Sequence, residues 1–180
     1  MTKFWALLVM TILVSPLPGA AQSLLVPMDR SQANHLKAYG LTYWSLEQYG
    51  EAEWLLNYRG GSFLLPDLEG LRRQAALRGI TIEPVSGADV AGIRAVIADS
   101  NMESVVLEKA PKIAIYTPPN STPWDDAVTM ALQYAQIPYE TIWDEEVIAD
   151  GLEDYEWLHL HHEDFTGQYS KFFITYSGAA

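Results

Sequence analysis

The sequence predicts an α/β protein with a mostly parallel sheet and helices on both faces. Short apolar runs alternate with longer segments of helical periodicity along the chain, and this alternation is typical of β-α-β units. Helix-start and helix-end residues separate the segments, with Ser31 placed as an N-cap and Gly79 as a stop. A composition of 49% hydrophobic and 12% aromatic residues is that of a globular chain.

The elements of the first part of the chain follow in this order. Apolar runs predict strands at 24–28, 54–58, 80–85 and 104–107. Helical patterns predict helices after the N-cap Ser31 at 31–48, after Pro66 and Asp67 at 66–77, and at 88–98.

Residues 109–111 form a short linker, after which the pattern is sharper. Strands are expected at 112–116, 139–143 and 156–161, a helix at 124–135, and an acidic loop or short helix at 144–155. Asp125 and Asp126 suit the start of their helix, because carboxylates there meet the positive end of the helix dipole. We therefore divide the chain into segments 1–21, 22–110 and 111–180.

The first 21 residues have the features of a secretory signal peptide. Lys3 is followed by an apolar run at 4–14 and by the small residues Gly19-Ala20-Ala21, so we expect cleavage near Gln22. The run is shorter than the roughly 20 residues that a transmembrane helix needs. The prediction is a periplasmic or secreted protein with no stable membrane span after cleavage.

The charge and the cysteine content exclude several kinds of site. A formal net charge of −12 without a basic run argues against binding to nucleic acid. The sequence contains no cysteine, which excludes disulfides, thiolate metal sites and a cysteine nucleophile within these 180 residues. The partner that we expect is a small molecule or a ligand of the cell envelope.

Polar residues follow two of the predicted strands, where ligands bind in parallel α/β sheets. The ligand-binding candidates are Asp29, Arg59, Gly60, Gly61 and Ser62. The Gly-Gly pair has two interpretations: a two-residue hairpin turn, or backbone amides beside an arginine that hold a carboxylate or phosphate.

A second group of candidates ends the strand at 156–161. His159 and His161 point to the same face of a strand, and His162, Glu163 and Asp164 follow. These residues suit a divalent metal such as zinc, or proton transfer near neutral pH. Packed histidines and a non-metal polar pocket are the alternatives.

Several segments resemble a known group of proteins. Residues 25–29, 34–40, 57–62 and 161–168 are similar to exported bacterial proteins labelled asparagine synthetase B, and residues 112–162 resemble the opening half of a class I glutamine amidotransferase-like domain. The resemblance implies a flavodoxin-like or class I amidotransferase-like sheet and a hydrolase-like or amidotransferase-like activity with an unresolved substrate.

The sequence departs from both families at their reactive groups. It lacks the N-terminal cysteine and the ATP loop of asparagine synthetase B, and also the cysteine of a class I amidotransferase. A non-catalytic periplasmic binding module, with Trp124, Trp143 and Trp157 as its contact surface, is therefore the alternative function.

The segment 172–176 lies close to residue 180 and has a strand-like composition. A parallel sheet is normally covered on both faces by further helices. We therefore expect the sheet to be incomplete at the C-terminus of this sequence and the chain to be an N-terminal fragment.

Overall fold

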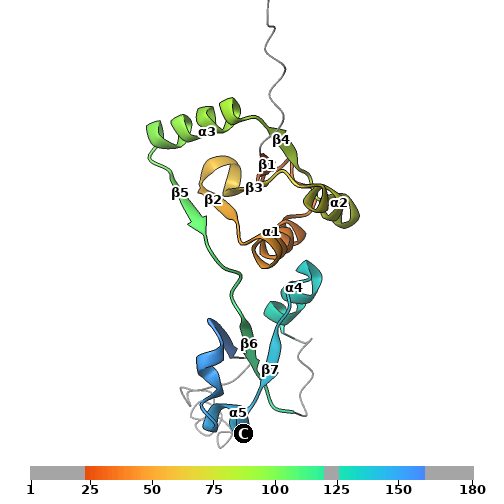
Figure 1. Cartoon of the computed structure of the whole chain (residues 1–180). Coiled ribbons are helices and arrows are strands. Elements are labelled where there is room, and N and C mark those ends of the chain that lie inside the picture. The colour runs from red at the N-terminus through yellow and green to blue at the C-terminus, as the bar shows by residue number, and fades with distance from the viewer. Residues whose placement is uncertain (1–22, 120–125, 161–180) are drawn as a thin grey trace, which may run out of the picture.

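A computed structural model describes residues 23–119 and 126–160 (Figure 1). The predicted signal peptide lies outside these residues. The strands are β1 (Ser23–Val26), β2 (Ala52–Leu56), β3 (Ser62–Pro66), β4 (Glu83–Val85), β5 (Glu103–Leu107), β6 (Ile113–Tyr116), β7 (Glu140–Ile142) and β8 (Trp157–Leu160). The α-helices are α1 (His35–Tyr49), α2 (Glu69–Arg78), α3 (Gly87–Asp99), α4 (Ala127–Ala135) and α5 (Asp144–Ile148).

The strands form two sheets, which confirms a mixed α/β architecture. One sheet has the order β4-β1-β3-β2-β5, and the other has the order β7-β6-β8. All neighbours in the three-stranded sheet are parallel, as expected. All neighbours in the five-stranded sheet are antiparallel, so a mostly parallel sheet in the first part of the chain was a wrong prediction.

The physical reason for this difference is the short connection between β2 and β3. Too few residues separate these strands for a crossover helix, so they pair as a hairpin, with Leu55 opposite Ser62. Strand β3 thereby lies between β1 and β2, which α1 connects and which run in the same direction. Helix α1 thus joins two strands that run in the same direction, β1 and β2, but β3 separates these two strands in the sheet.

Helices cover both faces of the five-stranded sheet, as the sequence predicted. On one face, side chains of α1 and α2 such as Leu41 and Leu71 pack with Leu24, Val26 and other buried residues. On the opposite face, two isoleucines of α3 pack with another set of strand residues. The alternation of side chains along β1 accounts for the split, because neighbouring leucines enter different clusters.

Helix α1 also connects the two sheets. In Figure 1 it lies between the five-stranded sheet and α4, which packs on β6. Gly40 of α1 is buried so close to the backbone of Ala135 in α4 that there is no room for a side chain. The hydroxyl of Tyr43 donates a hydrogen bond of 2.8 Å to the carbonyl of Pro111, which lies just before β6.

The order of the three-stranded sheet defines where a ligand site is expected. The chain runs from β6 through α4 to β7 on one side, and then places β8 on the other side of β6. Ligands of open α/β sheets bind at such a change of direction, outside the carboxyl ends of the strands.

Within residues 23–119 and 126–160, no helix has the length and apolar character needed to cross a bilayer.

Candidate functional site

Arg59 is held by two carboxylates within the five-stranded region. Its Nε donates to Asp29 at 2.7 Å, and its two terminal nitrogens donate to Glu83 at 2.7 and 2.9 Å. A further hydrogen bond of 3.0 Å runs to the hydroxyl of Ser31. Both the hydrogen-bonding capacity and the charge of the guanidinium are therefore used by the protein itself.

The glycines next to Arg59 have a structural explanation. They end the β2–β3 hairpin, as one interpretation of the Gly-Gly pair predicted, although the connection is longer than two residues and includes a 3₁₀ turn at Tyr58–Gly60. Gly60 and Gly61 have φ angles of 84° and 90°, a region that favours glycine. The hydroxyl of Ser62 donates to the carbonyl of Arg59 at 3.2 Å.

The ligand-binding candidates thus converge, but they bind one another. An anionic ligand at Arg59 would have to displace a carboxylate of Asp29 or Glu83. Glu83 was not predicted for this cluster, because only the pairing of Leu25 with Glu83 across β1 and β4 brings it there. Ser31 contacts Asp29 at 2.5 Å instead of starting α1, for which Asn34 is the N-cap.

The Asp29–Arg59 pair predicts a defined response to acid. Hydrogen bonds from Arg59 and Ser31 hold the pKa of Asp29 well below its usual value of 3.8. The stability from this pair is complete above the unfolded-state pKa and is lost as the pH falls towards the lower native value. When the pH is lowered from about 5 to about 3, we expect the free energy of unfolding to fall less in Asp29→Asn than in wild type.

Urea unfolding at both pH values measures this loss. Asp99→Asn is the control, because Asp99 is exposed and forms no ion pair with a described residue. A loss in Asp29→Asn as large as that in wild type would contradict the assignment.

A second polar pair lies at the switch point of the three-stranded sheet. Nε2 of His159, on β8, donates to Oδ2 of Asp126 at 2.9 Å. The side chain of Asp126 is 7% exposed and that of His159 is 19% exposed. Asp126 is also the N-cap of α4, accepting a hydrogen bond of 2.5 Å from the backbone of Val128.

The environment of Asp126 favours its ionised form. Burial raises its pKa, but the hydrogen bonds from His159 and from the Val128 amide outweigh this effect and hold the pKa below its usual value of 3.8. An ionised carboxylate that accepts from one imidazole nitrogen orients the ring and leaves the other nitrogen for a reacting group. The pair can therefore accept and return a proton.

Thr117 lies at the end of the central strand β6. It follows β6 directly, is 5% exposed, and its hydroxyl finds no hydrogen-bond partner among the described residues. A cavity of about 400 Å³ opens beside it at the carboxyl ends of β6 and β7. The cavity is lined by Thr117, Pro118, Pro119, Thr141, Ile142, Trp143, Glu145 and Glu146.

Four candidates for metal binding or proton transfer lie outside the described residues: His161, His162, Glu163 and Asp164. Trp124 also lies outside them, so the predicted roles of these residues stay predictions. Within the described ranges there is no group of three histidine, aspartate or glutamate side chains that could hold a metal ion. A zinc ion on His159 would have to use Nδ1, with Asp126 as the outer carboxylate that often orients metal-bound histidines.

Sequence reasoning missed Asp126 as a partner of His159. Asp126 was interpreted only as part of a helix start, and the distance of 33 positions in the chain hides the contact. The available signal was topological: the N-terminus of a crossover helix lies at the same edge as the carboxyl ends of its strands.

Comparisons of the chain with protein-family models, with curated proteins and with solved structures found no match.

Proposed function

We propose that this chain is an exported hydrolase-like or amidotransferase-like protein whose reaction takes place at the carboxyl ends of β6 and β8. The observation that carries the proposal is the hydrogen bond between His159 and the buried Asp126 at the switch point of the parallel sheet. The flavodoxin-like or class I amidotransferase-like fold and the relation to proteins labelled asparagine synthetase B belong to the same proposal. Their support is the parallel order β7-β6-β8 together with the sequence segments.

In the proposed reaction His159 is the general base. Its ring accepts a proton from a water molecule as that water attacks a carbonyl carbon, and returns the proton to the leaving group. Asp126 is a positioning residue, because it holds the ring in one tautomer and favours the positive charge that forms during transfer. Water is the nucleophile in this proposal.

Substitution of His159 tests the proposal directly. The probes are p-nitrophenyl acetate, an ester, and L-glutamine, an amide whose hydrolysis releases ammonia. For a probe that wild type hydrolyses, we expect His159→Ala to lower kcat by about a hundredfold, the usual contribution of a positioned general base. We expect Asp126→Asn to lower kcat with little change in KM, since asparagine is also a good N-cap and should preserve α4.

His35→Gln is the matched control, because His35 is the other histidine among the described residues. Its Nε2 contacts the backbone carbonyls of Met28 and Asp29 at 3.1 and 3.0 Å, far from the proposed site along the chain. Hydrolysis that falls equally in the His35 and His159 variants would contradict a specific role for His159. Absence of hydrolysis of both probes by wild type would remove the support for an enzyme.

The alternative proposal is a periplasmic module that binds a small molecule or an envelope polymer without turnover. The cavity of about 400 Å³ beside Thr117 and Trp143 favours it, because clefts of roughly this size hold small ligands. The indole of Trp143 stacks on Tyr116 with ring centroids 4.6 Å apart, so it helps to form a rigid wall. Trp157 is 41% exposed and is also available for contact.

A further inference from the structure

One buried hydroxyl among the described residues has no hydrogen-bond partner. Thr117 is 5% exposed, and its Oγ1 makes no hydrogen bond within residues 23–119 and 126–160. The buried hydroxyl of Thr42 shows the usual arrangement, because its Oγ1 donates to the carbonyl of Ala38 at 3.1 Å. A buried polar group without a partner lowers stability, and native structures contain few of them. The hydroxyl of Thr117 therefore indicates a partner from outside the chain.

Thr117 lines the cavity at the carboxyl ends of β6 and β7. The volume of this cavity is about 400 Å³, within the range of roughly 300–1,000 Å³ that is typical of small-ligand sites. The backbone fixes the position of Thr117, since its amide donates to the carbonyl of Ile142 at 3.0 Å and continues the pairing of β6 with β7. Sites for small molecules combine apolar walls with a few polar groups that are fixed in this way.

The charged side chains of this cavity are all acidic. Glu145 and Glu146 line it, and none of its described lining residues is a lysine, an arginine or a histidine. These carboxylates repel an anionic ligand and accept hydrogen bonds from a ligand that carries donors. Both glutamates are exposed, so water and salt screen their attraction for a cation. The charges therefore favour an uncharged ligand with hydrogen-bond donors.

The apolar part of the wall is stiff. Pro118 and Pro119 directly follow Thr117 and line the cavity with Trp143, and the ring of a proline fixes its backbone φ angle. The indole of Trp143 is stacked on Tyr116 with an angle of 28° between the ring planes. A sugar ring has a C–H face that fits an apolar wall and a rim of hydroxyls that fits Thr117 and the carboxylates.

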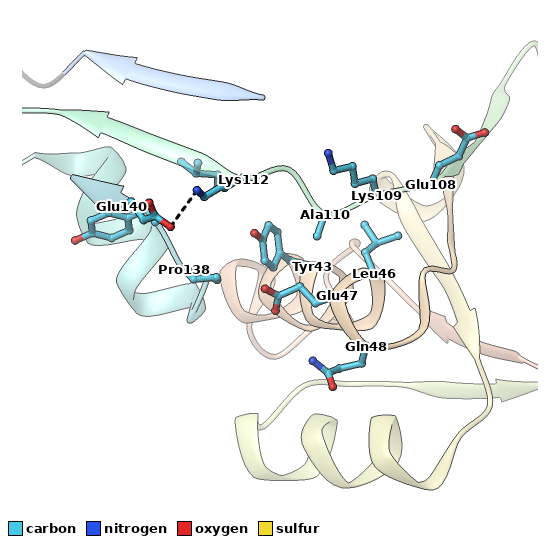
Figure 2. Close-up of a pocket in the computed structure, with 12 residues that line it drawn as sticks. Tyr43, Leu46, Glu47, Gln48, Glu108, Lys109, Ala110, Lys112, Pro138 and Glu140 are labelled. Carbon is cyan, nitrogen blue, oxygen red and sulfur yellow. Dashed lines mark ion pairs between the residues drawn. The ribbon is translucent and has the colours of Figure 1, made fainter. Parts of the chain in front are cut away.

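The larger cleft between the two sheets does not have this combination of features. Its volume is about 630 Å³, and Figure 2 shows the ion pair of Lys112 with Glu140 at its wall. Its other lysine, Lys109, forms an ion pair with Glu156. None of the described residues that line this cleft has a buried side-chain nitrogen or oxygen without a hydrogen bond. The smaller cavity is therefore the better indication of a ligand.

We propose that the cavity beside Thr117 binds an uncharged sugar or a similar polyhydroxylated molecule. The inference rests on the alternative function above, in which this cavity is a binding site, and it names the class of ligand. One ligand hydroxyl forms a hydrogen bond with Oγ1 of Thr117, and others donate to Glu145 or Glu146. The C–H face of the ring lies against Trp143. No chemical step is assigned to this site.

The test is a calorimetric titration of the full chain with sugars that differ in charge, at a slightly acidic pH where glucosamine is protonated. D-glucose and N-acetyl-D-glucosamine are uncharged, D-glucosamine is a cation, and D-glucuronate is an anion. We expect at least one uncharged sugar to bind with a dissociation constant below about 5 mM, and the charged sugars to bind more weakly. Weaker binding of both uncharged sugars than this limit would overturn the proposal. Tightest binding of a charged sugar would keep the cavity as a binding site and overturn the ligand class.

Thr117→Val tests the contact with the hydroxyl, because valine keeps the shape of the side chain. We expect two opposite effects. Binding of the uncharged sugar weakens about tenfold, since a ligand hydroxyl loses its partner, whereas the urea midpoint of unfolding rises, since no unpaired hydroxyl stays buried.

Thr42→Val is the matched control. Thr42 is 4% exposed, lies in α1 outside the lining of the cavity, and has a hydrogen-bonded hydroxyl. We expect this variant to bind sugar as wild type does and to have a lower urea midpoint than Thr117→Val. Unchanged sugar binding by Thr117→Val, or the reverse order of the midpoints, would overturn the role of Thr117. Binding is measured without turnover, so these results are independent of hydrolysis at His159.

Discussion

Gly40→Ala will lower the free energy of unfolding by at least about 3 kcal/mol, at the upper end of the range for overpacked cores. A Cβ atom at this position would lie 1.8 Å from the carbonyl oxygen of Ala135 and 2.8 Å from its carbonyl carbon. Both atoms belong to the backbone of α4, so no side-chain rotation can relieve the overlap. Helices α1 and α4 would have to move apart, which opens the junction between the two sheets.

Gly92→Ala is the matched control for this prediction. Gly92 also lies inside a helix, α3, but a Cβ there would meet no atom within 4 Å. Alanine is the better helix former, so this variant should gain about 0.5–1 kcal/mol. Urea unfolding followed by circular dichroism measures both changes. If the two alanines shift stability in the same direction, close packing of α1 on α4 is not what requires Gly40.

Gly60→Ala will lower the free energy of unfolding by about 3 kcal/mol, the sum of backbone strain and steric overlap. The φ angle of Gly60 is 84°, and a Cβ atom would lie 2.5 Å from the carbonyl oxygen of Met28. The amide of Met28 also donates to the carbonyl of Arg59 at 3.2 Å, so the two segments cannot separate without losing this bond.

Gly50→Ala isolates the contribution of backbone strain. Gly50 ends α1 with a φ angle of 67°, and a Cβ there would meet nothing within 4 Å. We expect it to cost about 1 kcal/mol, the strain of a left-handed residue alone. The same urea titrations give both values. Equal losses in the two variants would mean that the approach of Gly60 to Met28 does not decide why a glycine is present there.

The Gly60 result also bears on the two interpretations of the Gly-Gly pair. A glycine needed to expose amides to an anion would change ligand binding more than folding. The contacts of Gly60 and the full pairing of Arg59 with Asp29 and Glu83 instead predict a loss of stability. Contacts within the folded protein are therefore sufficient to explain why an arginine and a glycine occupy positions 59 and 60.

Periodicity and cap residues along the chain were sufficient to predict most elements and their type. Most strands and helices of the described ranges occur close to their predicted positions, because apolar spacing and turn residues act over a few residues. Strand β3 is an exception, since no strand was predicted at 62–66. The alternation of strand and helix led to the wrong prediction of parallel neighbours in the first sheet, although β1 and β2, which α1 connects, do run in the same direction. A connecting helix is long enough to bring the chain back to the edge of the sheet where the previous strand began, so the next strand runs in the same direction.

Neighbours in space were decided by tertiary structure. The sequence does not show that β3 enters between β1 and β2, because strand order depends on which apolar faces pack together after the hairpin forms. For the same reason, the sequence did not predict the hydrogen bond of His159 to Asp126 or the ion pair of Arg59 with Glu83. Side-chain type and strand position predict which groups are available for chemistry. The partners of these groups depend on how distant segments pack, because the burial of apolar surface stabilises contacts regardless of their separation along the chain.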